Sequence, residues 1–239
     1  QIKNKFNCVI HIYPLEFEPN YDYLNQAIKI FKRNGKSKVD CILGIGGGSV
    51  MDTAKAIAVM CSNNGSSIKF KGFPTNLNKP IPVIAIPSTT GTGSELVFNA
   101  SVIDNKNKQK MGINDVNNYP ILAILDPRIV AEAPINVVVS STFDALVHAI
   151  ESFSSPQTNE ITKIFVFEAI KKIFLSFPKI LKNNHSVKDW SNLQWAAYFA
   201  MVGLSNTSSG PTGALSYFLG VNFKVPHGYA GAFFLRKII

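Results

Sequence analysis

The sequence predicts an α/β fold in which a parallel sheet with crossover helices is followed by an all-helical domain. Short apolar runs alternate with helical patterns in the first half of the chain, and strand-like runs largely disappear after Pro134. Alternating strands and helices are typical of a parallel sheet, because parallel strands need a crossover connection. We therefore expect an α/β domain at residues 1–133 and a helical domain at residues 134–239.

The first domain is expected to contain four buried strands, at residues 8–13, 40–45, 82–86 and 121–125. A helical pattern begins at Asp22 and stops at Gly35, and the next expected helix covers residues 51–61. Two further β-rich runs, at residues 98–103 and 110–113, flank a polar turn and predict a hairpin.

The second domain shows apolar residues at helical spacing. They predict helices over residues 142–153, 160–177 and 189–204. Residues 205–213 are rich in Ser, Gly and Pro and are expected to form a loop.

Composition narrows the class of protein. The chain of 239 residues is 46% hydrophobic and 16% charged, which is typical of a globular protein. Its net charge of +9 comes from scattered lysines, so we expect no nucleic-acid partner. Since no apolar run approaches the ~20 residues that span a bilayer and no signal-peptide pattern is present, we expect no membrane partner and a cytoplasmic location. Cys8, Cys41 and Cys61 are odd in number and widely spaced, and are expected to be buried thiols.

Two polar, glycine-containing loops each follow an expected strand. Residues 46–49, Gly-Gly-Gly-Ser, precede the helix at 51–61, so their backbone N–H groups and the positive helix end can meet a phosphate. Residues 87–95 offer several hydroxyl groups beside two glycines. Either loop alone is also compatible with a tight chain reversal, and the second with a helix cap at Thr92 or Ser94. Two such loops at the carboxyl ends of parallel strands favour a nucleotide-binding crevice.

Asp144 and His148 are four residues apart in a helical pattern, so their side chains share one face. A carboxylate and an imidazole at this spacing can hold one divalent ion, although an ordinary hydrogen-bonded pair has the same spacing. His227 is a third candidate ligand from a distant part of the chain. His11, in an apolar strand, and His185, in a polar turn, are expected to be structural or solvent-exposed.

The order and spacing of these residues resemble the iron-containing alcohol dehydrogenase family. The resemblance covers residues from about 40 to 228 and rests on residues 46–49 with Asp52 and Lys55, residues 87–95, Asp126-Pro127, residues 144–151 and residues 226–228. It implies a nucleotide-binding, Rossmann-like domain followed by a helical metal-binding domain, the dehydroquinate synthase-like architecture, with cofactor and metal in the cleft between them. It also implies that an opening strand before Gln1 and the last helices after Ile239 are absent from this chain.

The resemblance implies NAD or NADP as the cofactor and assigns residues to it by position. Those that would contact the pyrophosphate are Gly47, Gly48 and Ser49. Those that would line its adenine and phosphate side are Ser88, Thr89 and Thr92, and further cofactor-side positions are Asn99 and Lys110. Asp52 and Lys55 belong to the same signature, with roles that could be structural.

The resemblance also implies a divalent metal, iron or zinc, and places Asp144, His148 and His227 at three of the family's four protein ligands. The fourth, usually a histidine, is Gly213 here, and another family histidine four residues further on is Tyr217. Three protein ligands and an open position form a competent Lewis-acid site, so we favour a dehydrogenase with a more open metal. The alternative is a nucleotide-binding relative with weak or lost metal-dependent activity.

The implied function is hydride transfer between an alcohol, such as a sugar or sugar acid, and the nicotinamide cofactor. Tyr217 could replace the missing histidine in a catalytic proton relay, because a phenol can donate and accept; packing against Phe218 or Phe223 is the alternative. We expect a small-molecule alcohol or aldehyde as the substrate and a homodimer as the assembly. A lyase of the dehydroquinate synthase type is a further alternative, which residues 144–151 disfavour.

Overall fold

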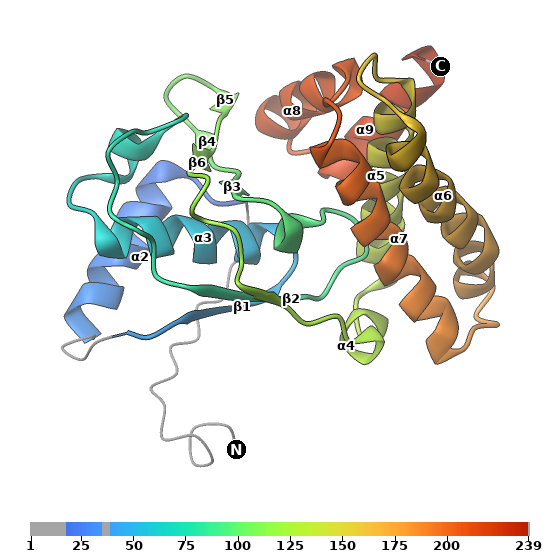
Figure 1. Cartoon of the computed structure of the whole chain (residues 1–239), viewed down its shortest axis with the longest axis horizontal. Helices are drawn as coiled ribbons and strands as arrows, with labels where there is room; N and C mark the ends of the chain where they lie inside the picture. The colour runs from blue at the N-terminus through green and yellow to red at the C-terminus, as the bar shows by residue number, and fades with distance from the viewer. Residues whose placement is uncertain (1–17, 35–38, 239) are drawn as a thin grey trace.

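The computed structural model, which describes residues 18–34 and 39–238, consists of an α/β part and a helical part (Figure 1). Its main sheet has three parallel strands in the order β1-β2-β7. They are β1 (Ile42–Gly46), β2 (Val83–Pro87) and β7 (Leu122–Ala123). The predicted α/β fold with a parallel sheet is confirmed, and the strand expected at residues 8–13 lies outside the described residues.

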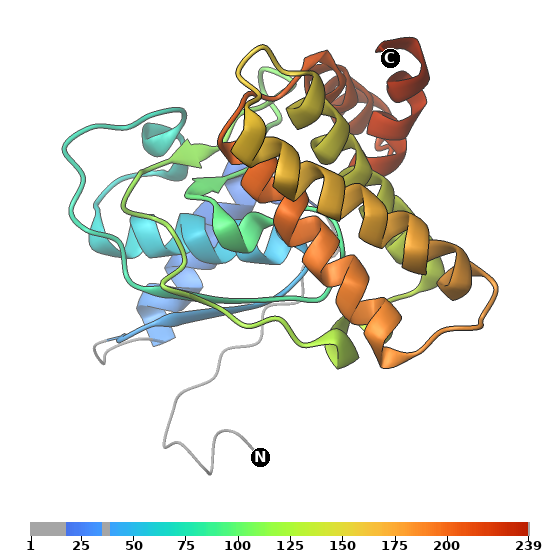
Figure 2. The same ribbon diagram turned by 45° about the vertical axis from the view of Figure 1, so that its right-hand side comes forward.

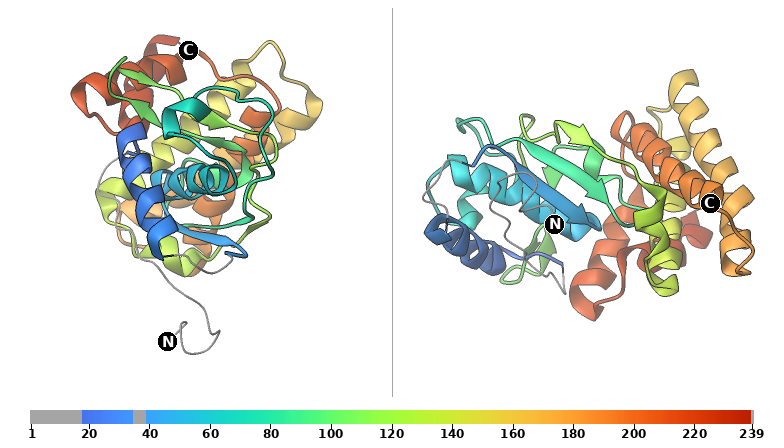
Figure 3. Two further views of the ribbon diagram at one scale, coloured as in Figure 1. Left: turned by 90° about the vertical axis from the view of Figure 1, so that its left-hand side faces the viewer. Right: turned by 90° about the horizontal axis from the view of Figure 1, so that it is seen from below.

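Helix α3 (Gly48–Ser62) packs directly on one face of the sheet, with α2 (Tyr21–Asn34) beside it (Figures 1 and 3). Small residues permit this close approach, since a Cβ added at Gly44 of β1 would lie 3.1 Å from the Cβ of Ala54. The core that α2 and α3 share includes Leu24, Met60 and Phe70. Because α3 is buried along most of its length, its first turn is held in a fixed place at the end of β1.

The opposite face of the sheet is open within the described part of the chain. Leu43 and Ile45 of β1 are each 48% exposed, and Leu122 of β7 is 50% exposed. The expectation of fully buried strands is wrong for this face, because alternate strand residues point away from the helix-covered side. Cys41, expected as a buried thiol, is also exposed just before β1, whereas Cys61 is half-buried and Cys8 lies outside the described residues.

A small antiparallel unit lies between β2 and β7 in the sequence and confirms the predicted hairpin. Its pairs are β3 (Asn99–Ala100) with β6 (Ile113–Asn114) and β4 (Ile103–Asp104) with β5 (Gln109–Lys110). Asp104 holds the turn by accepting hydrogen bonds from Lys71 and Asn107, and these bonds lower the pKa of the Asp104 carboxyl. Strand β5 contacts helix α8 (Pro211–Phe223) of the helical part, so the hairpin bridges the two parts.

The helical part contains α4 (Pro127–Ala131), α5 (Ile135–Ser154), α6 (Glu160–Leu181), α7 (Val187–Ser205), α8 (Pro211–Phe223) and α9 (His227–Ile238). Helices α5, α6 and α7 pack together around a core rich in alanine, including Ala145, Ala196 and Ala200 (Figure 2). Short side chains let these helices approach closely. Among the described residues, no helix is both long and apolar enough to cross a membrane.

Helices α3 and α7 begin three and two residues before their predicted ranges, and two other helix starts differ more. Helix α5 begins at Ile135, directly after Pro134, rather than at residue 142. Helix α8 begins at Pro211, inside the segment 205–213 that was expected to be a loop. Proline is favoured in the first turn of a helix, because its missing N–H is not needed there and its φ is already helical. The loop expectation is therefore wrong for the last residues of that segment.

Three glycines let separate segments approach at backbone distance. A Cβ at Gly91, in the loop after β2, would lie 2.4 Å from the carbonyl oxygen of Ser141 in α5. A Cβ at Gly93, where φ is +57°, would lie 2.3 Å from a side chain of α7. A Cβ at Gly228, in the first turn of α9, would lie 1.7 Å from the carbonyl oxygen of Ser140. No side chain fits at these positions without movement of the neighbouring segment.

Replacing Gly228 with alanine is expected to lower the free energy of unfolding by at least about 2 kcal/mol, because the obstacle is a backbone carbonyl and α9 must move away from α5. Gly220→Ala in α8 is the matched control, since the nearest atom outside the helix to its added Cβ is the carbonyl oxygen of Val225 at 3.6 Å. This control should be neutral or gain about 0.5–1 kcal/mol from helix propensity. Urea unfolding of the full chain measures both variants, and equal unfolding midpoints would contradict the close approach.

Candidate active site

A cleft of about 890 Å³ lies between the α/β part and the helical part. It brings together residues from both halves of the sequence. The predicted site residues that line it are Gly47, Gly48, Ser49, Thr89, Thr92, Asn99, Lys110, Asp144, His148, Tyr217 and His227. Ser88 is the exception: it is not among the residues that line the cleft, and its backbone N–H donates to the carbonyl oxygen of Gly46 at 2.9 Å.

The first wall of the cleft is the amino-terminal end of α3. Gly47 occupies the position before this helix, and no side chain caps the helix there. The glycines leave room for the neighbouring loop, since a Cβ at Gly48 would lie 2.7 Å from Cγ2 of Thr92 and one at Gly47 would lie 3.2 Å from Cγ2 of Thr89. An open helix start with glycines attracts anions through its backbone N–H groups and its dipole.

Lys55 is buried behind this wall, and Asp52, which contacts it, lines the cleft. The Lys55 side chain is fully buried, and its Nζ shares its three protons among the carbonyl oxygens of Ser94 (2.9 Å), Val97 (3.2 Å) and Asn99 (2.6 Å) and the hydroxyl of Ser94 (2.7 Å). It also lies 3.1 Å from a carboxylate oxygen of Asp52, which accepts the Ser94 hydroxyl proton at 2.6 Å. Burial lowers the pKa of Lys55, and Asp52 opposes that shift. One buried cation thus fixes the segment from Ser94 to Asn99.

The opposite wall carries one carboxylate and two imidazoles. Asp144 and His148 lie on adjacent turns of α5, and His227 is the first residue of α9. The Nε2 atoms of His148 and His227 lie 3.6 Å and 3.5 Å from the same oxygen of Asp144, and the potential ligand atoms all lie within 4.8 Å of one another. The distance between Asp144 and His148 is too long for a good hydrogen bond, so it weakens the interpretation of these two residues as an ordinary hydrogen-bonded pair. Burial lowers the pKa of His227, so its ring is neutral at pH 7, the form that binds a metal.

Glu151 was not singled out as a site residue, although it ends the same motif. It is buried on α5, seven residues after Asp144, and so follows the face that carries Asp144 and His148. Its Oε1 accepts the backbone N–H of Gly213 at 3.0 Å, and a Cβ at Gly213 would lie 3.5 Å from its Oε2. The position where a family histidine is missing therefore faces a buried carboxyl group.

Tyr217 packs against His227 and not, as the alternative from the sequence has it, against Phe218 or Phe223. Its ring stacks on the ring of His227, with centroids 5.0 Å apart and planes at 19°, and Phe218 and Phe223 instead contact each other. Nζ of Lys110 lies 5.1 Å from the centroid of the Tyr217 ring. Burial raises the pKa of the Tyr217 hydroxyl, so this group keeps its proton at neutral pH.

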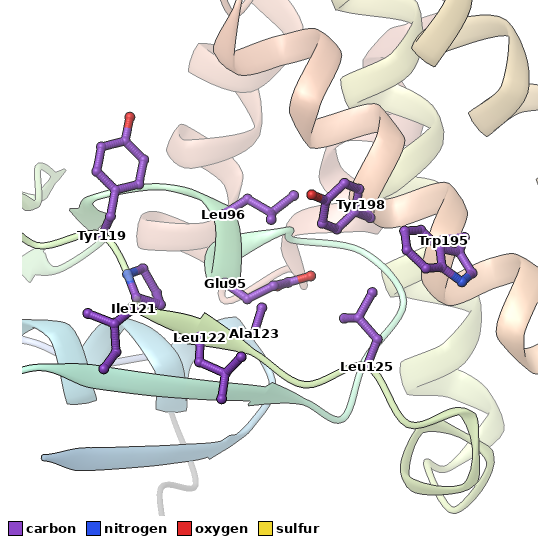
Figure 4. A pocket seen from close by; sticks show the side chains of 10 residues that line it. Glu95, Leu96, Tyr119, Ile121, Leu122, Ala123, Leu125, Trp195 and Tyr198 are labelled. Carbon is purple, nitrogen blue, oxygen red and sulfur yellow. The ribbon is translucent and has the colours of Figure 1, made fainter.

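A second hollow of about 560 Å³ lies between β7 and α7 (Figure 4). Its lining is mostly apolar and includes Leu122, Trp195 and Tyr198. The carboxyl group of Glu95 also lines it, and burial raises the pKa of this group. None of the predicted site residues lies there, so we assign the candidate site to the cleft that contains Asp144.

The parallel sheet with its glycine-rich turn, followed by packed helices, defines an α/β protein of the dehydroquinate synthase-like class. The family model for iron-containing alcohol dehydrogenase matches residues 2–127. The model for the C-terminal part of the Fe-containing alcohol dehydrogenase family matches residues 138–239. The chain therefore belongs to the iron-containing alcohol dehydrogenase family, and the resemblance seen in the sequence is confirmed.

Curated relatives and solved structures agree with this membership. The chain is 32% identical over 212 residues to the NAD-dependent methanol dehydrogenase of Bacillus methanolicus, covering 88% of this chain and 55% of that protein. It is 33% identical to the sulfoacetaldehyde reductase of Bilophila wadsworthia, covering 91% and 56%. The alcohol dehydrogenase from Oenococcus oeni superimposes with a TM-score of 0.90 at 26% identity, covering 98% of this chain and 60% of that one. The sulfoacetaldehyde reductase from Bifidobacterium kashiwanohense, in complex with NAD+, gives 0.84 at 26% identity, covering 93% and 59%. The chain spans about half the length of the curated relatives it matches.

Replacing Lys55 with methionine is expected to lower the free energy of unfolding by about 3–5 kcal/mol, because Asp52 and several carbonyl groups lose a buried partner. Lys171→Met is the matched control, since Lys171 is 73% exposed and lies 3.7 Å from Glu168 on the surface. The control should cost less than about 1 kcal/mol. Urea unfolding measures both, and a Lys55→Met protein as stable as the control would refute the structural role of this lysine.

Proposed function

We propose that this chain forms the cofactor- and metal-binding cleft of an oxidoreductase that transfers a hydride between an alcohol and a nicotinamide cofactor. The observation that carries the proposal is the convergence of His148 and His227 on one oxygen of Asp144, in the same cleft as the open start of α3. The family of the chain and the NAD-dependent relative support it. They also favour a dehydrogenase over a lyase of the dehydroquinate synthase type.

Asp144, His148 and His227 would hold the divalent ion. Their nitrogen and oxygen donors suit Fe²⁺ or Zn²⁺, and their mutual distances leave room for one ion between them. When bound, the ion supplies Lewis-acid stabilisation of negative charge on the substrate oxygen. Gly213 contributes no side chain, so three protein ligands leave an open position for the substrate, which favours an active enzyme over a relative that has lost activity.

Residues of the other wall would bind NAD or NADP. Gly47, Gly48 and Ser49 offer the amino-terminal end of α3 to the pyrophosphate. The remaining cofactor contacts would come from Thr89, Thr92, Asn99 and Lys110, which line the same cleft. Ser88 does not line it, so we propose no cofactor contact for this residue.

Tyr217 would hold and relay a proton near the substrate oxygen. The Tyr217 ring stacks on His227, so its phenol lies beside the proposed metal ligands. The raised pKa of the hydroxyl keeps it protonated at neutral pH, so it can donate this proton during the reaction. We therefore assign Tyr217 the role of a proton relay and not that of a general base.

The substrate would be a small alcohol or its aldehyde, with sugars among the alcohols that fit. Relatives are named for methanol, sulfoacetaldehyde and 4-hydroxybutyrate, so membership of the family does not narrow the choice. A sugar and a sugar acid both stay among the candidate substrates, because Glu151 is buried and is not among the residues that line the cleft. The change from strands to helices supports a domain boundary near Pro134. A homodimeric assembly and a cytoplasmic location stay predictions.

The full chain is expected to retain one Fe or Zn ion, and His148→Ala and His227→Ala should each lower the affinity for Zn²⁺ by more than about tenfold, because each removes a ligand. His185→Ala is the control, since this ring accepts a hydrogen bond from Trp190 at 3.1 Å and does not line the cleft. Metal content is measured together with nicotinamide reduction over a panel of alcohols. A wild-type chain that holds no metal and cannot be reconstituted would refute the proposal and favour a cofactor-binding relative.

A further inference from the structure

Ser216 places a buried hydroxyl between helix α8 and the ring of His227. The residue is 1% exposed, and its Oγ donates to the carbonyl oxygen of Gly213 at 2.7 Å. The same Oγ lies 3.0 Å from Nδ1 of His227. Ser216 therefore joins the backbone of one helix to a proposed ligand on the next.

The direction of these two hydrogen bonds follows from counting protons. A serine hydroxyl has one proton, and a carbonyl oxygen can only accept. Since the Ser216 proton points to Gly213, the Ser216 oxygen must accept from Nδ1 of His227, which therefore carries the ring proton. In a neutral imidazole the other nitrogen then has a free lone pair, and this Nε2 is the atom that lies 3.5 Å from Asp144.

The opposite arrangement is unfavourable. If Ser216 donated to Nδ1, its oxygen and the Gly213 carbonyl oxygen would lie 2.7 Å apart with no proton between them. The ring proton would then sit on Nε2 and point at Asp144, where it would block a metal ion. Burial makes the contact between the two oxygen atoms costly, because neither could then satisfy the other with a hydrogen bond.

We propose that Ser216 is a positioning residue that fixes the Nδ1–H tautomer of His227 and so keeps Nε2 open to a divalent cation. This inference rests on the proposed function. Tyr217, the next residue of α8, stacks on the face of the same ring. Ser216 thus contacts the edge of the His227 ring, and Tyr217 contacts its face. Nδ1 of His148 differs, since it is buried and has no hydrogen-bond partner among the described residues.

The direct test is ¹⁵N NMR of the four histidine rings in the metal-free full chain, at a pH well above the ordinary imidazole pKa of about 6.5. The wild-type His227 ring should show the Nδ1–H form. Ser216→Ala should lose this preference and bind Zn²⁺ about 10–100-fold more weakly, as is usual when the partner of a ligating histidine is removed. Ser216→Thr retains a hydroxyl and should restore the wild-type tautomer and affinity.

Ser154→Ala is the matched control, because the hydroxyl of Ser154 also donates to a helix carbonyl, that of Ile150 at 2.9 Å, but makes no hydrogen bond to a histidine among the described residues. It should change neither the tautomer nor the Zn²⁺ affinity. An Nε2–H ring in the wild type, or an unchanged tautomer in Ser216→Ala, overturns the role of Ser216 whether or not metal binds. A wild type that shows the Nδ1–H form, dependent on Ser216, yet takes up no Zn²⁺ supports the tautomer assignment and overturns the proposed function.

Discussion

Backbone contact at Gly91 and Gly228 is the constraint on which the cleft depends. Gly91 lies directly against the carbonyl oxygen of Ser141, and Gly228 lies against that of Ser140. Both serines are about one turn of α5 before Asp144. The loop after β2 and the first turn of α9 are thereby fixed to the same stretch of helix that carries the carboxylate. The relative placement of the two walls is consequently set by main-chain contact, which tolerates far less change than contact between flexible side chains.

Hydrogen bonds between buried polar groups stabilise both walls of the cleft. Lys55 secures the segment that begins at Ser94, and the hydroxyl of Thr90 lies 3.1 Å from that of Ser141 and 3.2 Å from that of Thr142. The cleft itself has the uncapped amino-terminal end of α3 on one wall and the ring nitrogens of His148 and His227 on the other. An anionic cofactor and a cation can then be held in the same cleft by groups that the fold keeps apart.

Local patterns in the sequence predicted what lies within one element. The alternation of strands and helices predicted the parallel sheet, and the four-residue spacing predicted that Asp144 and His148 share a helix face. Contacts between distant segments were not predictable in this way. The bond from Gly213 to Glu151 spans 62 residues, and the start of α8 at Pro211 was hidden in a composition typical of loops. Exposure of one sheet face also depends on which helices cover it, which apolar runs alone do not reveal.

Paramagnetic relaxation of bound NAD+ by Mn²⁺ in the full chain measures whether a cofactor and a metal ion bind in the same cleft. We expect Mn²⁺ to relax the nicotinamide protons much more strongly than the adenine protons, because a pyrophosphate held at the start of α3 would let the nicotinamide extend toward Asp144. His148→Ala should abolish the difference. Relaxation that is equal at both ends of the cofactor, or absent while both ligands are bound, would contradict a shared cleft.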